Sequence, residues 1–186
     1  MRGGAFCGGV HAIALLLLLA RWGHFARTVR RSHAALAPVM EWPVLLLGAS
    51  YAGGLAAWLS GAVGCLGNNI ALDWRRALAG IVILGAGAAL RIAGISRLGG
   101  AFSWGRRPTG DALVVEGVYA VWRHPMVTGY VLEVLSLCIL SRLDALAAIS
   151  ALAAVVSGIA QMRAEEAALS TRFGAVWQNY RKGSWP

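Results

Sequence analysis

Two short groups of polar residues stand out in a chain that is otherwise mostly apolar. Arg123 and His124 directly precede Pro125, and the adjacent pair Glu165 and Glu166 follows further along the chain. A cation, an imidazole and two carboxylates can bind an anionic group, move a proton and accept hydrogen bonds from ligand hydroxyls. Such side chains are costly near lipid unless they meet something polar, so they predict a functional site at the edge of a membrane.

Pro125 sets the position of this site relative to a helix. Proline has no backbone N–H and is favoured in the first turn, so a helix is predicted to begin at Pro125. The unpaired N–H groups and partial positive charge of a helix N-terminus suit an anion. Arg123 and His124 are therefore predicted to lie at the mouth of this helix.

The composition indicates the class of protein. Hydrophobic residues make up 58% of the 186 residues and charged residues only 13%, unlike an ordinary soluble domain. The formal net charge of +9 would suggest a nucleic-acid partner in a soluble protein, but here Lys and Arg cluster between apolar segments. We therefore expect an all-α, polytopic membrane protein that binds membrane lipids and no nucleic acid.

Five apolar segments predict about five transmembrane helices. The expected spans are 5–26, 44–64, 74–95, 125–140 and 146–161, the last two forming an antiparallel hairpin around the turn 141–144. We expect one membrane domain over 1–186, with an N-terminal two-helix part at 1–72 and a core at 73–186 that carries the site. The polar, basic connection 96–122 is longer than a structural loop requires and is expected to contribute to function.

The distribution of Lys and Arg predicts the orientation. The loops after the first and third spans and the C-terminal segment carry twelve of these residues, and the opposite side carries four. The former are Arg21, Arg27, Arg30, Arg31, Arg97, Arg106, Arg107, Arg123, Arg163, Arg172, Arg181 and Lys182, and the latter are Arg2, Arg75, Arg76 and Arg142. The excess marks the cytoplasmic side, so the N-terminus is predicted outside and the site in the cytoplasm.

Two charged residues lie inside the predicted spans. Arg91, near the end of the third span, is expected to extend to the membrane interface, with a role in the site as the alternative. Glu133 is an intramembrane carboxylate and hence a site candidate by default. We expect it to face the substrate pocket of the predicted site rather than lipid, with Arg91 as partner, and an unpaired, protonated Glu133 is the alternative.

The C-terminal segment is predicted to be an amphipathic helix. One face carries an acid followed by aromatic residues, which suits an interfacial anchor or a lid over the Arg-His mouth. The members of this face are Glu166, Ser170, Phe173, Trp177 and Tyr180. Glu165 and Glu166 lie roughly 100° apart on a helix, so we expect at most one of them to point into the pocket.

The three cysteines show no metal-binding spacing and no neighbour in sequence. Cys7, Cys65 and Cys138 lie in or beside apolar segments, which predicts small buried hydrophobic residues and neither a disulfide nor a metal site.

Four groups of residues over about 91–180, half of the chain, form a combined motif. They are Leu98-Gly99 with Phe102-Ser103, Leu113-Val114, Gly117-x-Tyr119-x-x-x-Arg123-His124-Pro125-x-x-x-Gly129 and Glu165-Glu166-x-x-Leu169-x-x-x-Phe173-Gly174-x-x-Trp177-x-x-Tyr180. This motif resembles that of a family of integral membrane methyltransferases, which includes isoprenylcysteine carboxyl methyltransferases and phospholipid N-methyltransferases.

The resemblance implies an S-adenosylmethionine-dependent methyltransferase whose lipid-like acceptor enters from the bilayer. It implies carboxyl O-methylation of an isoprenylcysteine-type substrate, with phospholipid N-methylation as the alternative, and no metal. By this resemblance, the cofactor-binding residues are Leu113, Val114, Tyr119, His124, Pro125, Met126, Val127 and Glu165. Catalytic roles, including contact with the polar group of the acceptor, go to Arg163, Glu166 and Arg123.

Three departures from the family pattern keep other functions open. Asp111 stands where a histidine is frequent, Val127 stands where a tyrosine is frequent, and the usual proline-rich ending is reduced to Trp185-Pro186. A non-catalytic membrane protein that retains the fold would fit the departures at Asp111 and Val127.

A haem protein is the third candidate, because two histidines lie in one span. His11 and His24 are thirteen residues apart, which places them about 220° apart around a helix, so they cannot grip one haem from a common face.

Overall fold

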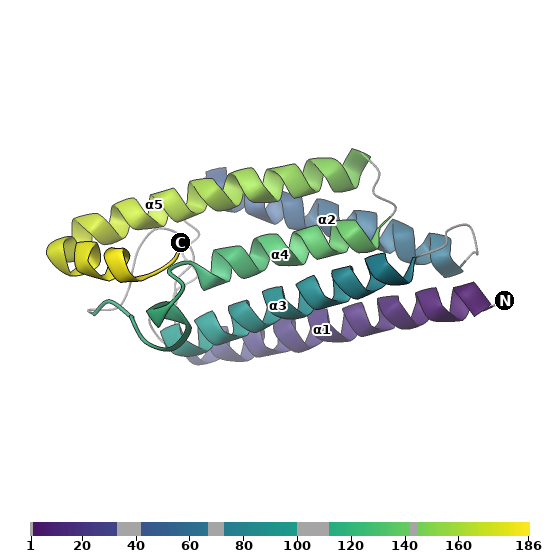
Figure 1. Cartoon of the computed structure of the whole chain (residues 1–186), viewed down its shortest axis with the longest axis horizontal. Coiled ribbons are helices and arrows are strands. Elements are labelled where there is room, and N and C mark those ends of the chain that lie inside the picture. Colours follow the sequence, from purple (N-terminus) through teal and green to yellow (C-terminus); the bar gives the residue numbers. More distant parts are fainter. Residues whose placement is uncertain (1, 33–41, 67–72, 100–111, 142–144) are drawn as a thin grey trace.

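The computed structural model describes residues 2–32, 42–66, 73–99, 112–141 and 145–186, and its regular elements in this part of the chain are five α-helices and one short 3-10 helix. These elements are α1 (Arg2–Ser32), α2 (Trp42–Leu66), α3 (Trp74–Leu98), the short 3-10 helix η2 (Gly117–Ala120), α4 (Pro125–Leu140) and α5 (Ala145–Gly183). The helices run back and forth along one long axis, with the two termini at opposite ends (Figure 1). The prediction of an all-α, polytopic membrane protein is confirmed.

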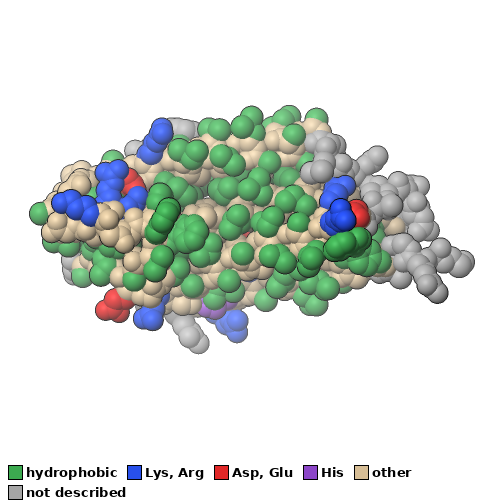
Figure 2. All heavy atoms as spheres, viewed as in Figure 1, with side chains coloured by type: hydrophobic (Ala, Val, Ile, Leu, Met, Phe, Trp, Pro, Cys, Tyr) green, Lys and Arg blue, Asp and Glu red, His purple; other side chains and the backbone are tan. Residues whose placement is uncertain are grey.

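Four of these helices are long and apolar enough to cross a membrane, namely α1, α2, α3 and α5. The fifth, α4, has 16 residues and extends about 24 Å, less than the ~30 Å of a hydrocarbon core. Hydrophobic side chains cover the middle of the face in view, and most of the Lys, Arg, Asp and Glu side chains lie towards its two ends or along its lower edge (Figure 2). The chain is therefore an integral membrane protein whose α4 is shorter than its neighbours.

The last helix differs from the prediction of a short span followed by a separate tail helix. The span and the tail form one helix, α5, interrupted only at Gly174, where φ is 48° and ψ is −120°. Glycine adopts this left-handed conformation without a Cβ penalty, and beyond it the chain turns back towards the bundle (Figure 1). Trp177 is 1% exposed, with its ring centroid 5.5 Å from that of Tyr180, so Trp177 itself does not face outwards, whereas Phe173 and Tyr180 of the same face are half-buried.

A buried charge cluster joins four helices inside the bundle. Arg21 of α1 donates from Nη2 to Glu133 Oε2 of α4 at 2.9 Å and to the Tyr51 hydroxyl of α2 at 2.5 Å. Arg91 Nη1 of α3 lies 3.6 Å from the same Glu133 oxygen. The prediction that Arg91 partners Glu133 is confirmed. The expectation that Arg91 extends to the membrane interface is wrong, because this side chain is 4% exposed. The placement of Arg21 in a loop is also wrong, because Arg21 lies inside α1 and is 1% exposed.

A disulfide joins α1 and α2 at the end of the bundle that holds the N-terminus. Cys7 and Cys65 are bonded, with Cα atoms 5.9 Å apart, so the expectation of three unlinked cysteines is wrong. The physical reason is the antiparallel arrangement, which brings the start of α1 next to the end of α2 (Figure 1). Cys138 is a buried residue of α4, as predicted.

Two glycines let the backbones of α3 and α4 touch. A Cβ atom on Gly87 would lie 2.7 Å from the carbonyl oxygen of Gly129, and a Cβ on Gly129 would lie 2.5 Å from that of Gly87. Small residues of this kind permit close helix packing in membranes. Gly85, on the same helix as Gly87, has nothing within 4 Å of its Cβ position.

Gly87→Ala is expected to destabilise the protein by about 1–3 kcal/mol, because the added methyl group meets backbone atoms that cannot move aside. Gly85→Ala is the matched control and should be neutral or stabilising by up to about 1 kcal/mol, since alanine favours a helix. Thermal unfolding of both variants in detergent measures the difference. Equal melting temperatures would show that the contact between α3 and α4 tolerates a side chain.

Candidate functional site

The polar site lies at the end of the bundle opposite the N-terminus. Pro125 is the first residue of α4 and His124 is its N-cap, as the prediction of a helix mouth requires. The 3-10 helix η2 stands just before this mouth, and the final part of α5 folds back beside it (Figure 1). The start of the short helix and the tail of the long one therefore meet here.

His124 lies between the two glutamates of α5. Its Nδ1 is 3.0 Å from Glu165 Oε2 and its Nε2 is 3.4 Å from Glu166 Oε1. Both glutamates contact this one ring although their positions lie roughly 100° apart on the helix, because two flexible side chains reach its opposite nitrogens. The imidazole is 1% exposed, whereas the side chains of Glu165 and Glu166 are 30% and 21% exposed.

Arg123 extends this network towards the C-terminus. Its Nε is 3.3 Å from Glu166 Oε1, and its Nη1 donates to the carbonyl oxygens of Arg181 at 2.9 Å and Ser184 at 2.8 Å. Arg181 Nη2 in turn lies 3.6 Å from Glu166 Oε2. Glu166 thus connects the mouth of α4 to the tail.

The last residues of the chain are hydrogen bonded to the segment before α4. The Arg123 N–H donates to the Trp185 carbonyl at 2.8 Å, and the Trp185 N–H donates to the Val121 carbonyl at 2.7 Å. The Tyr180 hydroxyl donates to the Tyr119 carbonyl at 2.5 Å. The tail therefore covers the mouth of α4, which agrees with the lid that the sequence predicted. Trp185 takes part in this closure, through contacts that no local sequence signal indicates.

Tyr119 lies at the inner edge of this network. It is 8% exposed, and its hydroxyl approaches α3, 3.3 Å from the Cβ position of Gly94. Burial raises the pKa of the Tyr119 phenol, and the negative charge of Glu165 raises it further. The hydroxyl is therefore protonated at neutral pH and can donate a hydrogen bond.

Four other predicted site residues lie before η2 or in the first turn of α4. Leu113 and Val114 are half-buried in the segment before η2. Met126 packs on α3, 2.8 Å from the Cβ position of Gly94, and Val127 faces Gly158 of α5. These two side chains therefore contact neighbouring helices.

Arg163 and Asp111 are the remaining residues that the sequence singled out. Arg163 is exposed on α5, and Asp111 lies outside the described residues. Gln161 was not anticipated, although it donates from Nε2 to Glu165 Oε1 at 2.9 Å. Its position four residues before Glu165 on a helix is the signal that could have identified it.

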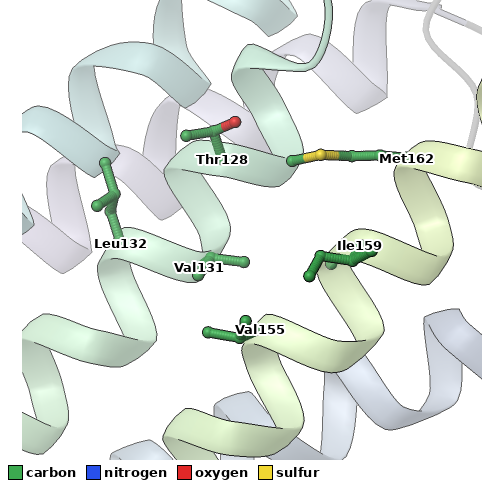
Figure 3. A pocket seen from close by; sticks show the side chains of 7 residues that line it. Thr128, Val131, Leu132, Val155, Ile159 and Met162 are labelled. Atoms are coloured by element: carbon green, nitrogen blue, oxygen red, sulfur yellow. The ribbon is translucent and has the colours of Figure 1, made fainter. Parts of the chain in front are cut away.

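An apolar cavity of about 140 Å³ lies between α4 and α5 next to this network (Figure 3). Thr128 of its wall lies one helical turn after His124, and its backbone N–H donates to the His124 carbonyl at 3.0 Å. Ile159, in its wall, is 46% exposed on the outer surface of the bundle. The cavity is lined by Thr128, Val131, Leu132, Val155, Gly158, Ile159 and Met162. An apolar chain could thus lie within reach of the polar site.

Comparison with known proteins places the chain in a family. A comparison with curated proteins returned no match. The family model described as phospholipid methyltransferase matches residues 75–176, more than half of the chain. The matched region contains α3, η2, α4 and most of α5, so it includes His124, Glu165 and Glu166. The chain therefore belongs to the phospholipid methyltransferase family, a family of integral membrane methyltransferases.

Proposed function

We propose that this protein is an S-adenosylmethionine-dependent methyltransferase that methylates a lipid-like acceptor from the bilayer. The observation that carries the proposal is the convergence of Glu165 and Glu166 on His124 beside an apolar cavity. Residues 73–186 would form the core that carries this activity, and the family match begins close to its start.

The residues around His124 fit the chemistry of the cofactor. A glutamate can accept hydrogen bonds from two ribose hydroxyls, and Arg123 or the N-terminal end of α4 can bind a carboxylate. Tyr119 offers an aromatic face to a sulfonium group. Glu165 is the proposed ribose ligand, which would exchange its hydrogen bond from Gln161 or His124 for one from a hydroxyl.

The remaining cofactor-binding residues are proposed from their positions along the same segment. Leu113 and Val114 precede η2, and Pro125, Met126 and Val127 form the first turn of α4. The bound cofactor would supply an electrophilic methyl group, and the protein would hold the acceptor in line with it. Positioning of this kind can supply most of the rate enhancement of a displacement reaction.

The hydrogen bonds of His124 favour carboxyl O-methylation over phospholipid N-methylation. An amine must lose a proton before it attacks, and His124 is the candidate base. Both nitrogens of this ring already lie close to carboxylate oxygens, at 3.0 Å and 3.4 Å, so an acceptor amine would have to displace a glutamate to reach either of them. A carboxylate acceptor of the isoprenylcysteine type needs no base. Arg163 and Arg123 are proposed to bind its charge, with Glu166 orienting Arg123.

Two linked measurements test this function. Calorimetric titration of the detergent-solubilised protein with S-adenosylhomocysteine should show saturable binding. Incubation with labelled S-adenosylmethionine and lipid extract should then transfer label to an acceptor, and mild base should release the label if the product is a methyl ester. A base-stable product would favour N-methylation. Absence of any binding would favour a non-catalytic membrane protein that retains the fold.

The proposed orientation places the polar site in the cytoplasm. The twelve-to-four distribution of Lys and Arg supports it, and so does the Cys7–Cys65 disulfide at the other end, because disulfides persist in oxidising compartments. A fluorescent reporter fused after Pro186 should be active, and a phosphatase reporter that works only outside the cytoplasm should be inactive. The reverse pattern would overturn this topology.

A further inference from the structure

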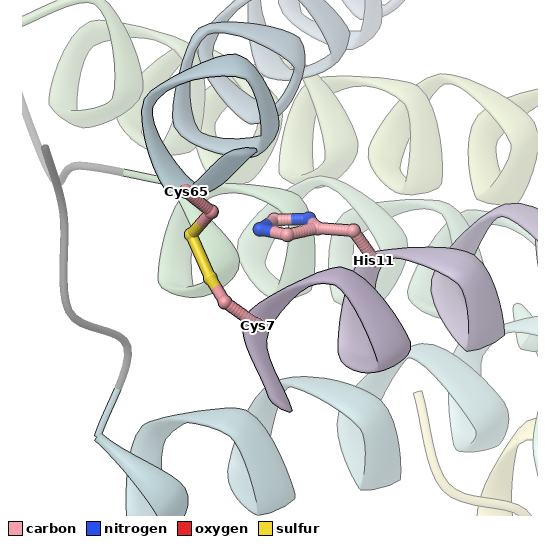
Figure 4. A group of neighbouring side chains, drawn as sticks. All are labelled: Cys7, His11 and Cys65. Carbon is pink, nitrogen blue, oxygen red and sulfur yellow. A yellow bond between two sulfur atoms is a disulfide. The ribbon is translucent and has the colours of Figure 1, made fainter. Parts of the chain in front are cut away.

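Three metal-ligating side chains meet at the end of the bundle opposite the polar site (Figure 4). Cys7 and His11 lie one turn apart on α1, and Cys65 lies near the end of α2. All three residues are buried, with exposed fractions of 1%, 7% and 2% in this order. One ligand atom from each lies within 4.8 Å of the others. The donor set is thus two sulfurs and one imidazole nitrogen.

His11 is the member of this group that a disulfide alone does not explain. Both of its ring nitrogens are buried, and neither has a hydrogen-bond partner among the described residues. The ring packs against Trp58 with centroids 5.7 Å apart and points towards the two sulfurs (Figure 4). A buried imidazole without a partner is unfavourable, whereas the same group is the commonest protein ligand for metals.

We propose that Cys7, His11 and Cys65 bind a divalent cation of the zinc type when the disulfide is reduced. Thiolate sulfur and imidazole nitrogen are the ligands that zinc prefers, and sites with two cysteines and one histidine are known for this ion. Charge selects a divalent ion in this setting. Two thiolates neutralise a charge of two, so the complex with neutral His11 carries no net charge inside an apolar region. A monovalent ion would leave one negative charge buried.

The exchange between the two states balances in electrons and protons. A dithiol reductant transfers two electrons and two protons to Cys7 and Cys65, breaking their S–S bond and forming its own disulfide. The cation then displaces one proton from each thiol, and both protons leave to solvent. Two metal–sulfur bonds and one bond to His11 form. The ends of α1 and α2 are therefore linked in both states, by a disulfide or by a metal.

Cobalt(II) is a suitable probe because its thiolate complexes absorb light, whereas those of zinc do not. The full-length protein in detergent is reduced with a dithiol, freed of reductant without air, and titrated with Co²⁺. We expect one cobalt per chain, a sulfur-to-cobalt charge-transfer band, and displacement of the cobalt by Zn²⁺. The oxidised protein should bind none. His11→Ala should weaken the binding at least about tenfold, since even residues that only support a ligand have effects of this size.

Matched controls separate this site from other side chains of the same kind. His24→Ala, on the same helix, and Cys138→Ser, on α4, should leave cobalt binding unchanged. His11→Ala retains both cysteines, so it tests the site even if Cys7→Ser fails to fold. Zn²⁺ should also raise the melting temperature of the reduced protein and not that of reduced His11→Ala. The proposal is overturned if the reduced protein shows no charge-transfer band, or if His11→Ala binds cobalt as tightly as the unaltered chain.

Discussion

Glu133→Gln is expected to lower the free energy of unfolding by about 3–5 kcal/mol, which is typical when one partner of a buried ion pair is removed. The substitution leaves the guanidinium groups of Arg21 and Arg91 without a counter-charge. The loss is costly because these residues are only 1% and 4% exposed. Glutamine has nearly the same size as glutamate, so the effect reports charge and not packing. Denaturant titration of the protein in detergent measures it.

Two controls make the interpretation of Glu133→Gln specific. Glu116→Gln removes an exposed carboxylate next to η2 and should change stability by less than about 0.5 kcal/mol. Combining Arg21→Met, Arg91→Met and Glu133→Leu should recover much of the lost stability, because an apolar replacement of a whole buried cluster is often neutral or stabilising. A loss below about 1 kcal/mol for Glu133→Gln would contradict the assigned role of the cluster.

The acceptor preference of this apolar combination gives a second readout. Glu133 is fully buried inside the bundle and does not face lipid. Whether it faces the acceptor stays a prediction. If stability recovers and acceptor preference changes, Glu133 or its partners contact the acceptor. If stability recovers and acceptor preference is unchanged, the cluster only holds the helices together.

Glu165→Ala is expected to weaken S-adenosylmethionine binding by about tenfold to more than a hundredfold, equivalent to about 1–3 kcal/mol. The reason is that ribose hydroxyls in a closed site would lose their acceptor and stay desolvated. The melting temperature should change little, since the Glu165 side chain is 30% exposed and exposed pairs contribute at most about 1 kcal/mol. Calorimetric titration with the cofactor and thermal unfolding measure the two quantities separately.

Glu166→Ala and Glu116→Ala serve as comparisons for this variant. Glu166 connects Arg123 to Arg181, so its removal should loosen the tail and weaken binding less than the loss of Glu165. Glu116 lies outside the network and its removal should have no effect. Should Glu165→Ala and Glu166→Ala both bind the cofactor normally, the tail of α5 has no part in the cofactor site.

Much of the architecture follows from properties that act within one segment. Apolar length identified the membrane helices, and the missing N–H of Pro125 located the start of α4. The cost of a carboxylate in hydrocarbon identified Glu133 as a residue that needs a partner, and Arg91 is one of its partners. Each of these inferences depends on the residue and its near neighbours in the chain, which is information that a sequence contains.

The contacts between helices depended on the tertiary structure. Hydropathy does not determine the rotation and relative height of two apolar helices, because lipid and protein are both apolar surroundings. For this reason Arg21 was placed in a loop although it pairs with Glu133 inside the bundle, and the Cys7–Cys65 disulfide was missed. Likewise, both glutamates reach His124 because the ring lies between them, a placement that requires α4 and α5 side by side. The sequence by itself determined the helices and the need of Glu133 for a partner, and only the packing of the helices decided which side chains meet.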